Sequence, residues 1–166
     1  MREFTVKAGR HNFSPRIPLH IRRGVTGFHQ AFVFDASCWY DTKAVGDHWN
    51  KLLGVTSAFS WNDRDACMAA WRPMPERGMF SVAAYANFPG KARSWRVLGE
   101  AEAGAHCELD CFFDKPEGLA TFEYKDMQAR LDFDAPNRIR QVGMWFGGQP
   151  KAPHDMKITA NIWFFT

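Results

Sequence analysis

The sequence lacks the long apolar runs that place a chain in or across a membrane. No stretch approaches the roughly 18 consecutive apolar residues that a spanning helix needs. The amino terminus, Met1-Arg-Glu-Phe-Thr-Val-Lys7, carries no apolar segment of the secretory type. We therefore expect a cytoplasmic protein that makes no use of a membrane.

Motifs for common cofactors are also absent. The sequence contains no glycine-rich phosphate loop, nucleophile elbow, paired-histidine zinc motif or calcium loop. The four cysteines, Cys38, Cys67, Cys107 and Cys111, show no metal-ligand spacing. Cys107 and Cys111 would stand about 13 Å apart on one face of a strand, too far to bridge each other. The sequence predicts reduced thiols and neither a metal nor another cofactor.

A strong excess of one charge is missing too. The chain has 21 Lys and Arg against 18 Asp and Glu, for a net charge of +3. A local excess lies between Arg10 and Arg23, where four arginines occur without an acid. Nucleic-acid binding is normally accompanied by a denser basic stripe, so no nucleic-acid partner is expected.

Aromatic residues are abundant, and the dominant hydrophobic period is two. The sequence has 15 Phe and 7 Trp. Apolar residues alternate with mainly polar ones at 106–113, 127–134 and 158–165, as in strands with one buried face. Proline and glycine clusters such as Pro116-Glu-Gly118 separate these runs. The pattern predicts one all-β domain over residues 1–166, an antiparallel β-sandwich of the jelly-roll, concanavalin-like type with about ten or more short strands.

Further expected strands are Ile17–Arg22, His29–Phe34, Ala66–Trp71, Met79–Asn87, Ser94–Gly99, Thr121–Tyr124 and Arg138–Trp145. A short helical turn is expected at Gly46–Leu53, with Asp47 as its cap. The last residues, 161–166, are apolar on both faces of a strand. This pattern predicts that the chain ends in a central strand.

One candidate site uses the carboxylates of the strand at 106–113. Glu108 and Asp110 would project from one face together with His106. The arrangement resembles the Glu-x-Asp-x-x-Glu strand of retaining β-glucan hydrolases, in which two carboxylates act together. Asp114, which would complete that pattern, is one residue out of step. The alternative interpretation is the solvated face of an amphipathic strand.

A second candidate site combines Arg72 with Tyr85 and Asn87. If the two strands pair, the guanidinium and aromatic rings can share one face of the sheet, where rings stack on sugars and Arg and Asn fix polar groups. The alternative places Trp71 and Tyr85 in the core and makes Arg72 a peripheral ion-pair partner.

The third candidate is the segment from Val142 to Met156, which is rich in glycine and proline. It contains Trp145 and the pair His154-Asp155, which has the residue types of an acid–base or metal pair. The alternative is that Asp155 accepts backbone N–H bonds and fixes the loop before the last strand.

Three segments together carry a family resemblance. These are Asn50-Lys-Leu-Leu-Gly54, Trp71-Arg72 before the tyrosine-bearing strand, and Trp145-Phe-Gly-Gly…Ala152-Pro-His-Asp155. In this order they resemble a group of small uncharacterised bacterial and phage proteins, over about residues 30–160. The resemblance implies a concanavalin-like jelly-roll fold and no established reaction. A histidine-rich stretch that precedes Gly-Trp-Arg in that group is Trp61–Ala70 here, which contains no histidine.

Together these patterns favour a non-enzymatic binding module that recognises a glycan or another polar ligand. The residues expected to contact the ligand are Arg72, Tyr85, Asn87, Trp145 and His154. One alternative is a phage or mobile-element accessory protein that binds a host protein through an exposed tryptophan. The other is a glycoside hydrolase or lyase that uses Glu108 and Asp110.

Overall fold

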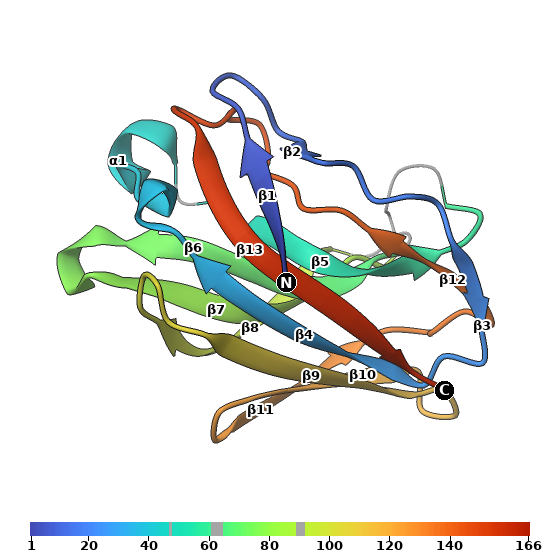
Figure 1. The fold of residues 1–166 in the computed structure, drawn as a ribbon. Helices are drawn as coiled ribbons and strands as arrows, with labels where there is room; N and C mark the ends of the chain where they lie inside the picture. The colour runs from blue at the N-terminus through green and yellow to red at the C-terminus, as the bar shows by residue number, and fades with distance from the viewer. Residues whose placement is uncertain (47, 61–64, 89–91) are drawn as a thin grey trace.

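The computed structural model describes residues 1–46, 48–60, 65–88 and 92–166, and these fold into two antiparallel sheets (Figure 1). The strands are β1 (Arg2–Val6), β2 (Phe13–Ser14), β3 (Ile21–Arg23), β4 (Gly27–Phe34), β5 (Asn50–Ser57), β6 (Cys67–Met74), β7 (Met79–Ala86), β8 (Ser94–Ala101), β9 (Cys107–Asp114), β10 (Leu119–Tyr124), β11 (Met127–Asp132), β12 (Arg138–Val142) and β13 (Met156–Phe165). The seven-stranded sheet has the order β11-β10-β9-β4-β13-β1-β2, and the six-stranded sheet β3-β12-β5-β6-β7-β8. The predicted β-sandwich is confirmed.

Aromatic side chains fill the space between the two sheets. Phe34 of β4 lies 5.1 Å from the ring of Trp71 on β6 and 4.7 Å from that of Phe80 on β7. All three side chains are fully buried. Each large ring removes 150–250 Å² of surface from water, roughly, so these inter-sheet contacts stabilise the pairing of the layers.

The last strand is central, as its two apolar faces predicted. β13 pairs with β4 on one side and with β1 on the other, and its register with β4 runs from Ile158 opposite Phe34 to Phe165 opposite Gly27. Figure 1 shows β13 crossing the middle of its sheet. Losing this strand would therefore expose both neighbours.

The prediction of a helical turn at Gly46–Leu53 is wrong. Asn50–Ser57 is the strand β5, and its register against β6 shifts between Lys51 and Gly54. The bulge buries Leu52 and Leu53 in succession, and this breaks the alternation and imitates a helical pattern. The short helix α1 instead spans Thr42–Val45, with the Asp41 side chain accepting a hydrogen bond from the Lys43 amide.

Other element bounds also differ from the sequence prediction. The expected strand at 17–22 is reduced to β3, and β1 was not predicted because its five residues carry a weak alternation. Short 3₁₀ helices span Ala36–Cys38 and Pro75–Arg77. The expected cap Asp47 and the turn at 89–90 lie outside the described residues, as do residues 61–64. No helix within the described ranges has the length and apolar character needed to cross a membrane.

All four cysteines are free and buried. Two of them meet across the sandwich: Cys67 Sγ of β6 lies 3.9 Å from Cys111 Sγ of β9. Burial raises the pKa of the Cys111 thiol, and the contact with Cys67 raises it further. In the sequence, only the pair Cys107 and Cys111 is close enough to suggest a contact. A contact between cysteines on two different sheets leaves no local pattern in the sequence.

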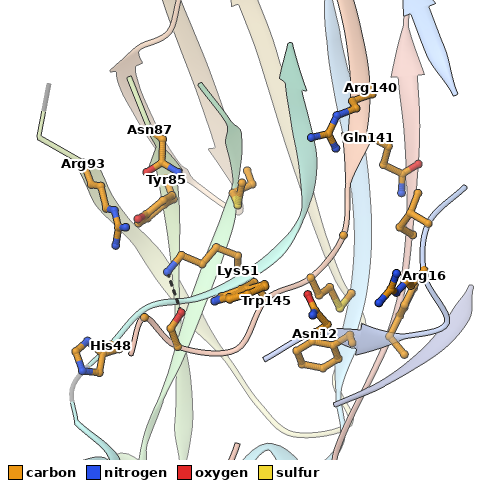
Figure 2. Close-up of a pocket in the computed structure, with 18 of the residues that line it drawn as sticks. Asn12, Arg16, His48, Lys51, Tyr85, Asn87, Arg93, Arg140, Gln141 and Trp145 are labelled. Carbon is orange, nitrogen blue, oxygen red and sulfur yellow. Dashed lines mark hydrogen bonds between the residues drawn. The ribbon is translucent and has the colours of Figure 1, made fainter. Parts of the chain in front are cut away.

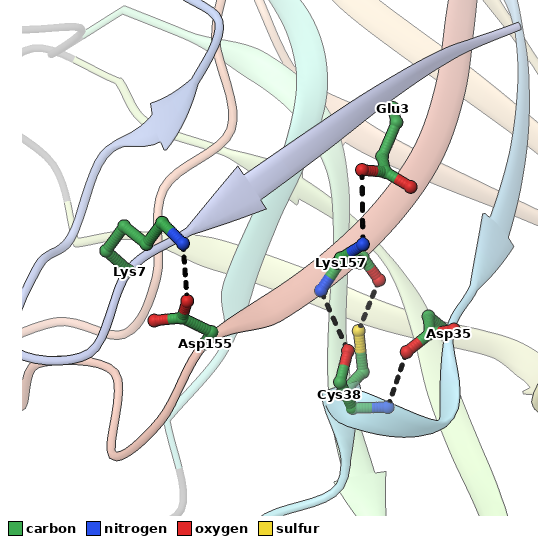
Figure 3. A network of polar contacts seen from close by, with 7 residues as sticks. Glu3, Lys7, Asp35, Cys38, Asp155 and Lys157 are labelled. Atoms are coloured by element: carbon green, nitrogen blue, oxygen red, sulfur yellow. Dashed lines mark hydrogen bonds and ion pairs between the residues drawn. The ribbon is translucent and has the colours of Figure 1, made fainter.

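Polar contacts join the end of β1 and the segment at 35–38 to the start of β13 (Figure 3). Asp155 accepts hydrogen bonds from the Lys7 Nζ at 2.6 Å and from the Ala8 amide at 2.9 Å. These bonds lower the pKa of the Asp155 carboxyl. The Cys38 thiol donates to the Lys157 carbonyl at 3.0 Å. Asp155 thus holds the segment before β13 against the end of β1, the structural role that its position in the loop suggested.

Candidate binding cleft

A cleft of about 1180 Å³ opens over the outer face of the six-stranded sheet (Figure 2). Met68 of β6 and Tyr85 of β7 belong to this face, together with Val142 of β12. The N-terminal segment at 12–17 and the loop at 143–149 complete the walls. The full lining is Phe4, Asn12, Phe13, Pro15, Arg16, Ile17, His48, Lys51, Met68, Tyr85, Asn87, Arg93, Arg140, Gln141, Gly143, Met144, Trp145, Gly147, Gly148 and Gln149.

The charge of this lining has one sign. Arg16, Lys51, Arg93 and Arg140 all line the cleft, and no Asp or Glu occurs among its described lining residues. The four cations come from four separate parts of the chain, and Figure 2 shows them distributed along the length of the cleft. Clefts lined by one sign of charge raise the local concentration of ligands of the opposite sign.

Lys51 lies at the centre of the cleft, directly before the bulge of β5. Its Nζ donates to the Trp49 carbonyl at 2.6 Å and lies 4.9 Å from the centre of the Tyr85 ring. Burial, together with the positive charge of Arg93, lowers the pKa of Lys51 from 10.5 to about 8. The ammonium is therefore mainly protonated at pH 7 and loses its charge as the pH rises through about 8.

Tyr85 forms part of the floor and is almost fully buried. Burial raises the pKa of its hydroxyl, and a hydrogen bond with Arg93 acts in the opposite direction. The hydroxyl is thus neutral at physiological pH. It orients Arg93 without cancelling the guanidinium charge.

Trp145 lies against the bulge of β5 and is partly open to solvent. Its backbone pairs with that of Lys51, through Lys51 N to Trp145 O at 2.8 Å and Trp145 N to Lys51 O at 3.1 Å. The indole stacks on the His11 ring, with ring centres 4.9 Å apart and an interplanar angle of 7°. It remains 39% exposed, so one edge or face is accessible from the cleft.

A buried amide fixes the loop that follows Trp145. Asn50 is fully buried; its Nδ2 donates to the Tyr40 hydroxyl at 2.9 Å, and its Oδ1 accepts from the Gly147 amide at 2.6 Å. Gly147 has a φ of 60°, and a side chain there would approach the Pro150 carbonyl to 2.7 Å. The loop therefore keeps a defined course along the wall of the cleft.

Three of the five predicted ligand-contacting residues lie together in the cleft: Tyr85, Asn87 and Trp145. Arg72 faces the same side of the sheet but lies outside the lining, 4.7 Å from the Trp49 ring. His154 is remote and exposed, with Nε2 2.8 Å from the Ser37 carbonyl oxygen.

The pairing assumed for the second candidate site is present, but its aromatic rings separate. β6 and β7 are antiparallel neighbours, with Trp71 opposite Val82 and Met68 opposite Tyr85. Trp71 faces the core between the sheets, whereas Tyr85 faces the cleft. Trp71 and Arg72 are consecutive residues of β6, so strand alternation places their side chains on opposite faces of the sheet.

The carboxylates of the alternative enzyme site lie on the other sheet. Glu108 and Asp110 project from the outer face of β9, and Asp110 Oδ1 is 2.9 Å from His29 Nδ1. Neither lines the cleft. Their use as a catalytic pair stays a prediction.

Sequence inspection missed the cationic residues that give the cleft its charge. Arg16 belongs to the basic segment at 10–23, which was assigned to ordinary surface, and Lys51 was placed in a helical turn. Arg93 and Arg140 carried no local signal. In the part of the chain that the structure describes, no group of three or more His, Cys, Asp or Glu side chains is placed to hold a metal ion.

Comparisons with known proteins concern the fold. No family model matches the sequence, and no curated protein matches it. An alginate lyase from Pseudomonas aeruginosa superposes with a TM-score of 0.53 at 8% identity, covering 85% of this chain; the chain spans 64% of that enzyme. An alginate lyase from Alteromonas sp. 272 gives a TM-score of 0.52 at 10% identity, covering 98% of this chain and 79% of the enzyme.

A functionally unknown protein from Saccharomyces cerevisiae gives a TM-score of 0.53 at 10% identity and covers 99% of this chain and 89% of its own. At these identities the likeness concerns architecture alone. The chain is a jelly-roll-like β-sandwich of the kind found in these solved structures.

Proposed function

We propose that this protein is a binding module that holds an acidic polysaccharide in the cleft of the six-stranded sheet. The observation that carries the proposal is the lining charge: three arginines, one lysine and no carboxylate among the described lining residues. Uronate or sulfate groups of a glycan would pair with these cations through charge-assisted hydrogen bonds.

The shape of the cleft supports a chain ligand. Its volume of about 1180 Å³ exceeds the range of roughly 300–1,000 Å³ that is usual for small-molecule sites. Trp145 offers a partly exposed ring of the type that stacks on sugar faces. Several sugar units can therefore lie along the cleft, with the guanidinium of Arg93 at one end and that of Arg16 at the other.

The structural neighbours add a second argument. Two of them are named as alginate lyases, and alginate is a polymer of uronic acids. The shared architecture is compatible with an acidic glycan lying across one sheet. Because identity to these enzymes is 8–10%, their reaction is not transferred to this chain.

Isothermal titration against alginate oligosaccharides, with neutral dextran oligosaccharides and single-stranded DNA as comparison ligands, tests the proposal. Alginate is expected to bind, and Arg93→Ala is expected to weaken it about fivefold, because one charge-assisted contact contributes on the order of 1 kcal/mol at a partly solvated site. Arg130→Ala is the matched control, since Arg130 is exposed on β11 of the other sheet.

Affinity should also fall with added salt and with a rise in pH from 7 to 9, as Lys51 loses its proton. Equal binding of dextran, or unchanged alginate affinity in Arg93→Ala, would contradict the proposal. Tighter binding of DNA than of any glycan would replace it with a nucleic-acid function. Shortening of the oligosaccharides during incubation would show that the protein is an enzyme and not a binding module.

A further inference from the structure

The outer face of the seven-stranded sheet carries an aromatic row that no part of the described chain covers. Phe112 of β9 and Phe165 of β13 both stand opposite Gly27 of β4. Their rings stack with centres 5.4 Å apart and an interplanar angle of 14°. A side chain at position 27 would collide with the Cys111 carbonyl and press on the Phe165 ring at 3.0 Å. Because position 27 has no side chain, the Phe112 and Phe165 rings can stack on each other above β4.

A second row follows on the same three strands. His29 of β4 stands opposite Asp110 and Trp163. Its Nδ1 lies 2.9 Å from Asp110 Oδ1, and its ring centre lies 5.3 Å from that of Trp163. Trp163 is 46% exposed and Phe112 is 42% exposed. These two rows, Phe112–Gly27–Phe165 and Asp110–His29–Trp163, form the aromatic face of the sheet.

The charge around the aromatic face is opposite to that of the cleft. Alternation along the strands and their cross-strand register define which side chains point outward. On the seven strands the outward acids are Glu3, Glu108, Asp110, Asp114, Glu123 and Asp132, and the outward strong bases are Arg130 and Lys157. Over the whole outer side of these seven strands, six carboxylates against two bases give a formal charge of −4, in a chain whose net charge is +3.

A shallow depression extends the aromatic face along β9. It has a volume of about 520 Å³ and is lined by Thr26, Phe112, Phe113, Asp114, Lys115, Pro116 and Thr121. Two phenylalanines, one carboxylate and one lysine thus border a recess next to the exposed stack. A side chain that inserts there meets the apolar wall of Phe112 and can reach the carboxylate of Asp114.

We propose that the aromatic face is a docking surface for a basic protein segment that presents arginine. A planar guanidinium stacks on an exposed indole such as Trp163 while it donates in parallel to a carboxylate such as Asp110 or Asp114. The charge of −4 attracts such a segment and repels the acidic ligand proposed for the cleft. Exposed Trp and Phe next to ionic groups are also typical of the residues that dominate protein interfaces.

The test uses the full chain and three synthetic peptides of equal length, one rich in arginine, one rich in lysine and one rich in glutamate. The indole N–H signal of Trp163, assigned by Trp163→Phe, is followed by nuclear magnetic resonance. The arginine peptide is expected to shift this signal and to bind more tightly than the lysine peptide, because lysine lacks the planar fork. The glutamate peptide is expected not to bind.

Two variants and one matched control separate this surface from the cleft. Trp163→Ala and Asp114→Asn are each expected to weaken the arginine peptide about three- to fivefold or more, in line with exposed cation–π and ionic contacts. Trp95→Ala is the control, because Trp95 has the same 46% exposure but lies on β8 of the other sheet. Alginate binding is expected to be unchanged in Trp163→Ala, so the proposals for the cleft and for the aromatic face can be refuted separately.

Three results would overturn the proposal. The first is equal affinity of the arginine peptide for the wild type and Trp163→Ala. The second is a neutral oligosaccharide that binds in a Trp163-dependent manner while the peptide does not, which would make the face a glycan site. The third is concentration-dependent self-association that Trp163→Ala abolishes, which would make the occupant a second copy of this chain.

Discussion

Replacement of Lys51 by methionine should change stability in opposite directions at neutral and at alkaline pH. Methionine keeps most of the apolar stem and removes the ammonium that burial disfavours. Lowering the pKa from 10.5 to about 8 corresponds to at most about 3 kcal/mol against the charged form, and the solvent in the open cleft reduces this to about 2 kcal/mol. Loss of the hydrogen bond to the Trp49 carbonyl costs the variant about 1 kcal/mol.

At pH 7 the net result is a variant more stable by about 1 kcal/mol, or about 2–4 °C in Tm for a domain of this size. The folded pKa lies below the unfolded one, so the unfavourable contribution is full below pH 8 in the wild type. It fades between pH 8 and 10.5, because the folded protein releases its proton first. Toward pH 10.5 only the lost hydrogen bond remains, and Lys51→Met becomes the less stable protein by about 1 kcal/mol.

Urea denaturation of both proteins from pH 7 to pH 10.5, followed by circular dichroism, measures this difference. Other groups that titrate in this range are present in both proteins, so their contributions to the difference in unfolding free energy cancel. Lys125→Met is the control, because Lys125 also donates to a backbone carbonyl, Glu100 O at 2.6 Å, but is exposed. Parallel stability curves for wild type and Lys51→Met would refute the burial of this ammonium and, with it, the pH dependence of ligand binding.

Three further outcomes are expected. Deletion of residues 162–166 removes half of the pairing between β13 and β4 and should cost roughly 5–8 kcal/mol, close to the whole stability of a domain; a far-UV spectrum that keeps its β-sheet signal would contradict this. Gly54→Ala should destabilise by about 3 kcal/mol in chemical denaturation, because the new methyl would collide with the side chain of Met68 on β6; Gly143→Ala, whose nearest contact would be 3.6 Å away, should change little. Refolding with glutathione disulfide should join Cys67 to Cys111 and release two glutathione thiols per bond. Closing this loop adds at most about 4 kcal/mol, and a non-reducing peptide map without the cross-link would show that the sulfurs do not meet.

Patterns local in sequence predicted most of the strands correctly. Alternation at 106–113 and 127–134 corresponds to β9 and β11, and the doubly apolar terminus to the central strand β13. The prediction was wrong at Gly46–Leu53, where a bulge next to Lys51 places consecutive leucines in the core. A bulge depends on the neighbouring strand, so the segment by itself could not reveal it.

The structure brings together some of the candidate site residues and separates others. Tyr85, Asn87 and Trp145, which were selected by side-chain type, line the cleft. His154 lies elsewhere, since proximity along the loop says nothing about which way the loop turns. The cations of the cleft were missed because lysine and arginine occur throughout the surface of any soluble domain.

The sequence by itself determined which segments are strands, which side of each strand is apolar, and that the aromatic residues require two stacked layers. Only the tertiary structure decided that the basic side chains of positions 16, 51, 93 and 140 meet over one sheet while six carboxylates gather on the other. The physical reason is that alternation acts between neighbours in the chain, whereas the order of strands in a sheet depends on contacts between residues far apart in it. Charge on each face follows from that order.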